Sequence, residues 1–129
     1  MPESVPPEVE RLLTSEPRVA HLATTRENRP HVAPLWYRYE DGVIEVLTTG
    51  RILENVSANP RVALSIQDDD DGIPNWVVTV RGHATVVEDE EVAREHNRKL
   101  NRKYGVDEDS WSENTLVRIT VGSTSYRQY

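Results

Sequence analysis

The longest strand pattern in the sequence is Trp76-Val77-Val78-Thr79-Val80-Arg81-Gly82-His83-Ala84-Thr85-Val86-Val87. Trp76, Val78 and Val80 fall on one face of this strand and Val77 on the other, because side chains alternate along a strand. A long strand that is apolar on both faces needs cover on both sides. One barrel covers one of these faces, so the stretch predicts a sheet protein that pairs with a second copy of itself.

Further strand patterns lie on both sides of this stretch. They cover Arg18–Thr25, His31–Tyr39, Val43–Thr48, Arg61–Gln67 and Leu116–Val121, and the tail Ser123–Tyr129 is expected to add a last extended segment. Glu40-Asp41-Gly42 predicts a hairpin, since Asp-Gly tolerates the positive φ angles of a tight turn. The first hairpins are too short for parallel crossovers, so the sheet is expected to be mostly antiparallel. Gly82 predicts a bend or a close backbone approach.

Three helices are expected between these strands. The first follows Pro6-Pro7, the second covers Arg51–Ala58, and the third covers Glu88–Tyr104 with Gly105 as its cap. The acidic stretch Asp68–Pro74 is expected to be a loop. Six or seven strands with few helices predict an α+β fold, a barrel that closes on itself and hides its edges.

Composition limits the function classes. The 129 residues predict one domain, 1–129, and the net charge of −7 argues against a nucleic-acid partner. No apolar run is long enough for a membrane helix, and the first residues lack the pattern of a signal peptide. The chain has no cysteine, which excludes disulfides and a cysteine nucleophile. We expect a cytoplasmic protein without a membrane partner.

Catalytic motifs are scarce. There is no G-x-S-x-G, and none of the four histidines has a metal-ligand spacing. The run Asp68–Asp71 lacks the alternating ligands of a calcium loop and is interpreted as a solvated surface. No metal site is expected, and the residues alone identify no catalytic acid or base.

Thr48-Thr49-Gly50-Arg51 lies where a strand ends and a short helix begins. Free N–H groups and the helix dipole attract anions at such a point, so two hydroxyls, a glycine and an arginine fit a phosphate cradle. An ordinary threonine N-cap beside a surface arginine explains the same residues equally well.

Pro34 lies in the middle of the strand pattern His31-Val32-Ala33-Pro34-Leu35-Trp36. Proline removes a donor from the sheet ladder, so it indicates an edge or a bulge. The backbone there would be free to face a planar ring, or the position is simply a barrel corner.

These stretches together resemble the pyridoxamine 5′-phosphate oxidase-like family, especially its small FMN- or F420-binding branch. The similarity begins at Glu16–Thr24, continues through Arg29–Tyr37 and Thr48–Arg51, includes Asn55 and Asn59–Leu64, and ends at Trp76–Val87. Each motif alone is weak, but their order and spacing are specific for the fold.

The resemblance implies a split β-barrel homodimer that holds FMN, or alternatively F420, at the subunit interface. The strand His31–Trp36 would then lie along the ring, Thr48, Thr49 and Arg51 would meet the phosphate, and Trp76 would reach the cofactor across the interface. The implied cofactor-binding residues are His31, Val32, Ala33, Pro34, Leu35, Trp36, Thr48, Thr49, Arg51, Asn55 and Trp76.

One stretch departs from the family pattern. Relatives often carry lysine and other basic residues just after the Gly-Arg, where this chain has Ile52-Leu53-Glu54. Two functions therefore remain open at this stage. The first is an FMN- or F420-dependent oxidoreductase acting on an unidentified small-molecule substrate. The second is a non-catalytic carrier or sensor of the same fold with a weakened phosphate site.

Overall fold

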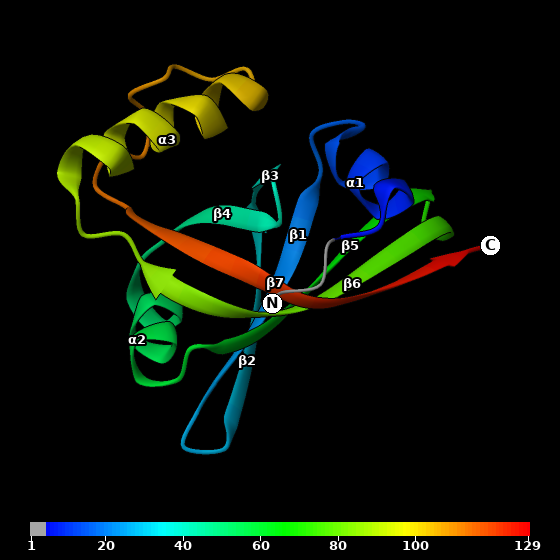
Figure 1. Cartoon of the computed structure of the whole chain (residues 1–129), viewed down its shortest axis with the longest axis horizontal. Helices are drawn as coiled ribbons and strands as arrows, with labels where there is room; N and C mark the ends of the chain where they lie inside the picture. Colours follow the sequence, from blue (N-terminus) through cyan, green and yellow to red (C-terminus); the bar gives the residue numbers. More distant parts are fainter. Residues whose placement is uncertain (1–4) are drawn as a thin grey trace.

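The computed structural model describes residues 5–129, which form one curled seven-stranded sheet and three helices (Figure 1). The strands are β1 (Val19–Arg26), β2 (Arg29–Trp36), β3 (Arg38–Glu40), β4 (Val43–Thr48), β5 (Arg61–Asp70), β6 (Ile73–Val86) and β7 (Thr115–Gln128). The helices are α1 (Pro7–Thr14), α2 (Gly50–Ala58) and α3 (Glu90–Lys103). No helix in this part of the chain is long and apolar enough to span a membrane.

The sheet is antiparallel throughout, in the order β2-β1-β5-β6-β7-β4-β3. Its two edge strands, β2 and β3, are consecutive in the sequence and are separated only by Tyr37. The curled sheet therefore brings its own edges together, which confirms the predicted α+β split barrel. The position of Pro34 on edge strand β2 confirms the prediction of an edge.

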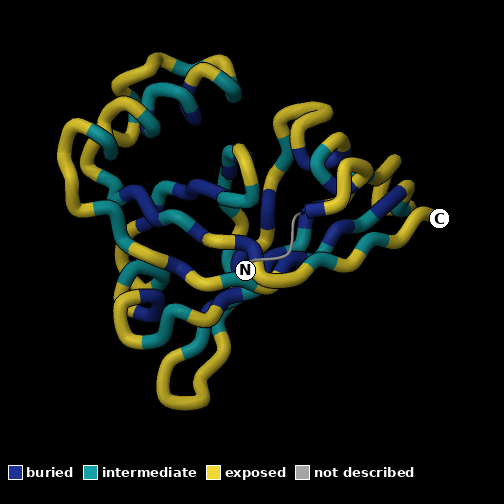
Figure 2. The backbone as a smooth tube through the Cα atoms, viewed as in Figure 1, coloured by how far each residue is buried: buried dark blue, intermediate teal, exposed yellow. Residues whose placement is uncertain are grey.

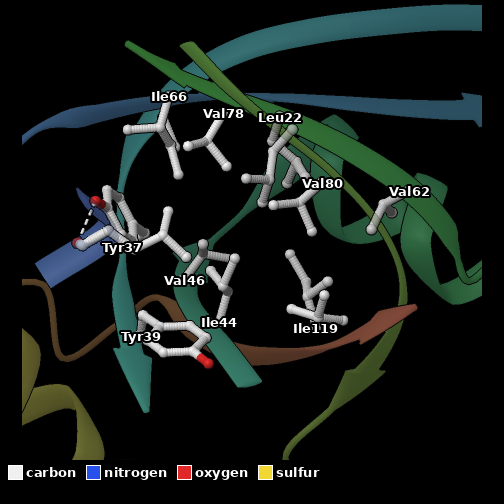
Figure 3. Close-up of a cluster of buried hydrophobic side chains, with 14 of the residues drawn as sticks. Leu22, Tyr37, Tyr39, Ile44, Val46, Val62, Ile66, Val78, Val80 and Ile119 are labelled. Atoms are coloured by element: carbon white, nitrogen blue, oxygen red, sulfur yellow. Dashed lines mark hydrogen bonds between the residues drawn. The ribbon is translucent and has the colours of Figure 1, made fainter. Parts of the chain in front are cut away.

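The core lies inside the curl of the sheet. Buried residues alternate with more exposed ones along β1, β5 and β6, whereas the β1–β2 hairpin tip is exposed (Figure 2). Figure 3 shows these side chains converging, among them Leu22, Ile44, Val80 and Ile119. Tyr37 is fully buried, and its hydroxyl donates to the backbone carbonyl of Leu13 at 2.6 Å, which ties α1 to the barrel.

The predicted single strand His31–Tyr39 was wrong, because the structure divides it at Tyr37. The backbone N–H of Tyr37 donates to the hydroxyl oxygen of Tyr104 at 3.1 Å, and its carbonyl accepts from Lys103 Nζ at 2.7 Å. Side chains from the end of α3 thus replace the ladder bonds that Tyr37 gives up as the chain crosses from one edge of the sheet to the other. A pattern of alternating residues carries no sign of this break.

Two other boundaries also differ from the prediction. Asp68–Pro74 is not a loop, because β5 and β6 continue to a two-residue turn at Asp71 and Gly72, with φ angles of 50° and 88°. The tail is extended as expected, but it continues β7 to Gln128, and β7 pairs with β6 from Val117 to Gln128.

α3 covers the outer face of β4 and β7, and a buried carboxylate fixes it there. Glu45 on β4 is 4 % exposed. It accepts hydrogen bonds from Arg38 and Arg118, and it pairs with Nδ1 of His96 on α3 at 2.8 Å. Asp89 caps the helix by accepting from two backbone N–H groups of its first turn.

Candidate functional site

A polar cavity of about 410 Å³ lies where the β1–β2 hairpin meets the start of α2. We call it the basic pocket, and it is lined by Arg26, Glu27, Arg29, Pro30, His31, Arg51, Glu54 and Asn55. The structure therefore brings together three of the predicted residues, His31, Arg51 and Asn55, which come from one strand and one helix.

The start of α2 is free of side-chain capping. Thr49 has an extended backbone and makes no capping hydrogen bond, so the ordinary N-cap interpretation is wrong. Gly50 has a φ of 58°, a conformation that glycine adopts without strain, and it turns the chain into the helix. Thr48 is buried, and its Oγ1 has no hydrogen-bond partner among the described residues. The first N–H groups of α2 therefore donate no hydrogen bond to the Thr49 side chain.

Asn55 fixes the position of α2 on the barrel. It is 5 % exposed, and its Nδ2 donates to Thr24 Oγ1 on β1 at 3.0 Å. This bond joins the helix that carries Arg51 to the strand that leads into the hairpin. The two walls of the basic pocket are therefore held together by a buried contact.

The β1–β2 hairpin supplies arginines that sequence reasoning missed. Arg26 and Arg29 face each other across the turn, whose residues Glu27 and Asn28 have φ angles of 52° and 61°. Two arginines that flank a two-residue turn are visible in the sequence, but the turn pattern does not indicate what the arginines face. Arg26 lies 4.0 Å from Glu54, whereas Arg29 and Arg51 have no ion pair within residues 5–129.

The departure at Ile52-Leu53-Glu54 takes on a different meaning in the structure. Ile52 and Leu53 are half-buried and pack against the hydrophobic core, so they do not line the basic pocket. Glu54 does line it, opposite Arg26. Arg26 and Arg29 thus place two positive charges on the hairpin side of the cavity.

A second cavity, of about 260 Å³, lies at the other end of β2 beneath α3. We call it the aromatic pocket, and it is lined by Leu35, Trp36, Leu47, Leu100, Trp111 and Asn114. β2 thus contributes Pro30 and His31 to one pocket and Leu35 and Trp36 to the other. Residues four or five apart along a strand are separated by about 13–17 Å.

The remaining predicted residues line neither pocket, and they are Val32, Ala33, Pro34, Thr48, Thr49 and Trp76. Val32 is 62 % exposed on the edge strand, and Ala33 and Pro34 lie beside it. Trp76 is 8 % exposed in the core of its own protomer, with the Arg18 guanidinium 5.1 Å above its ring. Its contact with a cofactor across a subunit interface stays a prediction.

The family model of pyridoxamine 5′-phosphate oxidase matches residues 6–128. The chain belongs to this family. The fold and the resemblance predicted from the sequence motifs are confirmed by that match, which spans nearly the whole chain. No curated protein matches the sequence.

Several solved structures are similar to this chain. It is similar to a FAD-binding protein from Mesorhizobium loti, with 25% identity, a TM-score of 0.76, and 98% of this chain and 97% of that chain covered. It is also similar to an F420 reductase, with 26% identity, a TM-score of 0.73, and 89% and 94% covered. A conserved hypothetical protein from Mycobacterium tuberculosis shares the fold at 22% identity, with a TM-score of 0.79 and 96% and 85% covered.

Proposed function

We propose that the protein is an oxidoreductase that binds FMN or the deazaflavin F420 and acts on a small molecule. The observation that carries the proposal is the basic pocket, where Arg29 and Arg51 have no ion pair within the described residues and lie beside the free start of α2. Guanidinium groups and helix N-termini are the donors that bind phosphate in proteins. The chemistry of the donor set therefore fits the phosphate of either cofactor.

The bound cofactor would supply the redox chemistry through its ring system, and the chain would position it. Arg51 and Arg29 would bind the phosphate, and Asn55 would keep the α2 wall in place through Thr24. β2 would lie along the ring, since an edge strand has backbone groups free to bond with it. The FAD-binding and F420 reductase neighbours support a flavin-type cofactor.

We also propose that the active form is a cytoplasmic homodimer. β6 is 14 residues long, and Val77 and Thr79 are only half-buried on the face that its own barrel does not cover. A partner subunit on that face would complete the cover that a long two-faced strand needs. Trp76 lies on the opposite, inward face of the same strand.

The test is a titration of the purified protein with FMN and with F420, repeated on Arg51→Ala. Loss of a charge-assisted hydrogen bond of about 1.5–3 kcal/mol predicts at least about tenfold weaker binding with unchanged folding. Arg61→Ala is the matched control, because Arg61 is an exposed arginine at the start of β5 outside the basic pocket. Equal affinities for wild type and Arg51→Ala would contradict the assignment.

The titrated protein also separates the two functions that the sequence left open. An oxidoreductase passes electrons from its reduced cofactor to an acceptor, whereas a carrier or sensor binds the cofactor without turnover. We expect the reduced complex to be reoxidised faster by an electron-accepting small molecule than free reduced cofactor is. A bound cofactor that no tested acceptor reoxidises faster would support the non-catalytic alternative.

A further inference from the structure

We infer that the aromatic pocket beneath α3 is a binding site for a neutral aromatic molecule of one or two fused rings. The inference deepens the proposed function. The aromatic pocket is the substrate site of the oxidoreductase, and this role rests on the proposed function. The binding itself follows from the pocket alone, whether or not a cofactor is bound.

The lining of the pocket selects against charge. Its residues are three leucines, two tryptophans and one asparagine, and none of them is ionisable. A charged ligand would lose its hydration there without gaining an ion pair, which is costly. An apolar cavity of ~150 Å³ is large enough to hold one benzene ring, so about 260 Å³ suits one ring or a fused pair.

Trp36 forms a fixed wall of this pocket. Its ring stacks on Tyr104 with 4.4 Å between centroids and 4° between planes. The Tyr104 hydroxyl is itself held, since it donates to the carbonyl of Arg18 and accepts from the backbone N–H of Tyr37. The wall is therefore in place before a ligand arrives, which reduces the cost of ordering on binding.

Trp111 also lines the pocket and is held in an unfavourable conformation. Its φ is 60°, in the left-handed region that a bulky residue rarely adopts, and it is 51 % exposed. A large apolar side chain gains nothing from solvent in such a position. Strained residues of this kind concentrate at ligand clamps.

The loop before Trp111 is fixed from beneath. Asn101 on α3 is fully buried, and its Nδ2 donates to the carbonyls of Glu108 and Ser110 at 3.0 and 2.8 Å. The carbonyl of Trp111 accepts from the backbone N–H of Asn114 at 2.9 Å. These bonds hold the backbone on both sides of Trp111 in place.

Asn114 is the one side-chain amide of the lining. Its side chain makes no hydrogen bond within residues 5–129. The amide can therefore donate to, or accept from, a heteroatom of the ligand. This favours a heteroaromatic or hydroxylated ring over a plain hydrocarbon.

Quinoline is the probe that tests this inference. Its binding is monitored by NMR through the ¹⁵N-resolved indole N–H signals of the full chain without cofactor. The three tryptophans give three signals, and Trp76 serves as an internal reference because it lies in the core away from the pocket. We expect the Trp36 and Trp111 signals to shift saturably while the Trp76 signal stays. Parallel, non-saturating shifts of all three signals would overturn the inference.

Variants and a charged analogue sharpen the test. Trp111→Ala should weaken quinoline binding at least tenfold, and Trp111→Phe should restore most of it. Glu113→Gln, in the same loop but outside the lining, should leave it unchanged. Quinoline-2-carboxylate should bind at least tenfold more weakly than quinoline, and equal binding would contradict a neutral site.

The cofactor experiment stays separate from this one. Saturating FMN or F420 should leave quinoline bound, and complete displacement of quinoline would show that the pocket holds the cofactor ring instead, which overturns the inference. If the chain binds neither cofactor, the proposed function fails, while the quinoline result without cofactor still decides the binding site.

Discussion

Lys103 has surroundings unlike those of an ordinary surface lysine. Its Nζ lies 3.7 Å from the centroid of the Tyr37 ring and donates to the Tyr37 carbonyl, and it has no carboxylate partner within residues 5–129. Burial, with a smaller contribution from the nearby Arg38 charge, lowers the pKa of Lys103 to about 8. The charged form of this amine therefore costs the folded protein stability at neutral pH.

This pKa predicts a rise in stability with pH. The unfolded lysine keeps its proton up to a pKa of about 10.4, so the unfolded state binds more protons between pH 8 and about 10, and the free energy of unfolding rises there. We expect the free energy of unfolding to rise by about 1 kcal/mol, and Tm by a few degrees, between pH 7.5 and 9.5. Burial raises the pKa values of Tyr37 and Tyr104. Their contribution to the free energy of unfolding therefore falls only as pH rises above about 10, outside this window.

Thermal melts of Lys103→Met check this prediction. The variant should lose the gain in Tm between pH 7.5 and 9.5. Lys99→Met is the control, since Lys99 is a surface lysine that pairs with Glu95. A gain that persists in Lys103→Met and disappears in Lys99→Met would show that the wrong amine was identified.

Residue patterns predicted part of the candidate site and missed part of it. His31, Arg51 and Asn55 could be named because their motifs follow the family order, and they do meet in one pocket. Arg26 and Arg29 could not, because their approach to Arg51 depends on how the hairpin folds over α2. Spacing along the chain carries no information on that contact.

At the scale of the element, the β6–β7 pairing depends on one glycine. The register of the pair shifts between Arg81 and Gly82. A Cβ at Gly82 would lie 2.5 Å from the Thr120 carbonyl oxygen and 2.7 Å from Ile119 Cγ2. The close backbone approach that the sequence predicted at Gly82 is therefore confirmed.

Gly82→Ala should destabilise the fold because backbone must move to make room. We expect a loss of about 1–3 kcal/mol in the free energy of unfolding, as for other overpacked sites. Gly122→Ala is the matched control in the facing strand, where the nearest atom, the Arg81 carbonyl oxygen, would be 3.3 Å from the new Cβ. Denaturant unfolding in which Gly82→Ala costs no more than Gly122→Ala would contradict this account.

Most elements could be predicted from periodicity and turn residues, and the exceptions have a common cause. The strands and α2 follow from alternating apolar residues and from Gly or Pro at their ends. The break at Tyr37 and the length of β7 depend on partners far away in the sequence, namely Tyr104 and Lys103 for the first and β6 for the second. Local patterns determine local structure, and these two features are not local.

For the whole molecule, the account predicts a dimer. One chain has a mass of 14.7 kDa, and sedimentation equilibrium at micromolar concentration should give twice that value. The physical reason is the half-buried second face of β6, which a partner would cover. A monomer at all concentrations up to the millimolar range would contradict the proposed assembly.

The central claim is that the basic pocket binds the phosphate of a flavin or deazaflavin. Isothermal titration with FMN and with riboflavin tests it most directly when FMN is the cofactor, because the two ligands share the ring and differ only in the phosphate. F420 titrated against the Arg51→Ala variant covers the deazaflavin case.

The account predicts that FMN, or F420 in its place, binds the wild type with measurable affinity that weakens as salt is raised. FMN should bind at least about tenfold more tightly than riboflavin, since the phosphate gains charge-assisted bonds of about 1.5–3 kcal/mol. Equal affinities for FMN and riboflavin, together with F420 binding that Arg51→Ala leaves unchanged, would contradict it.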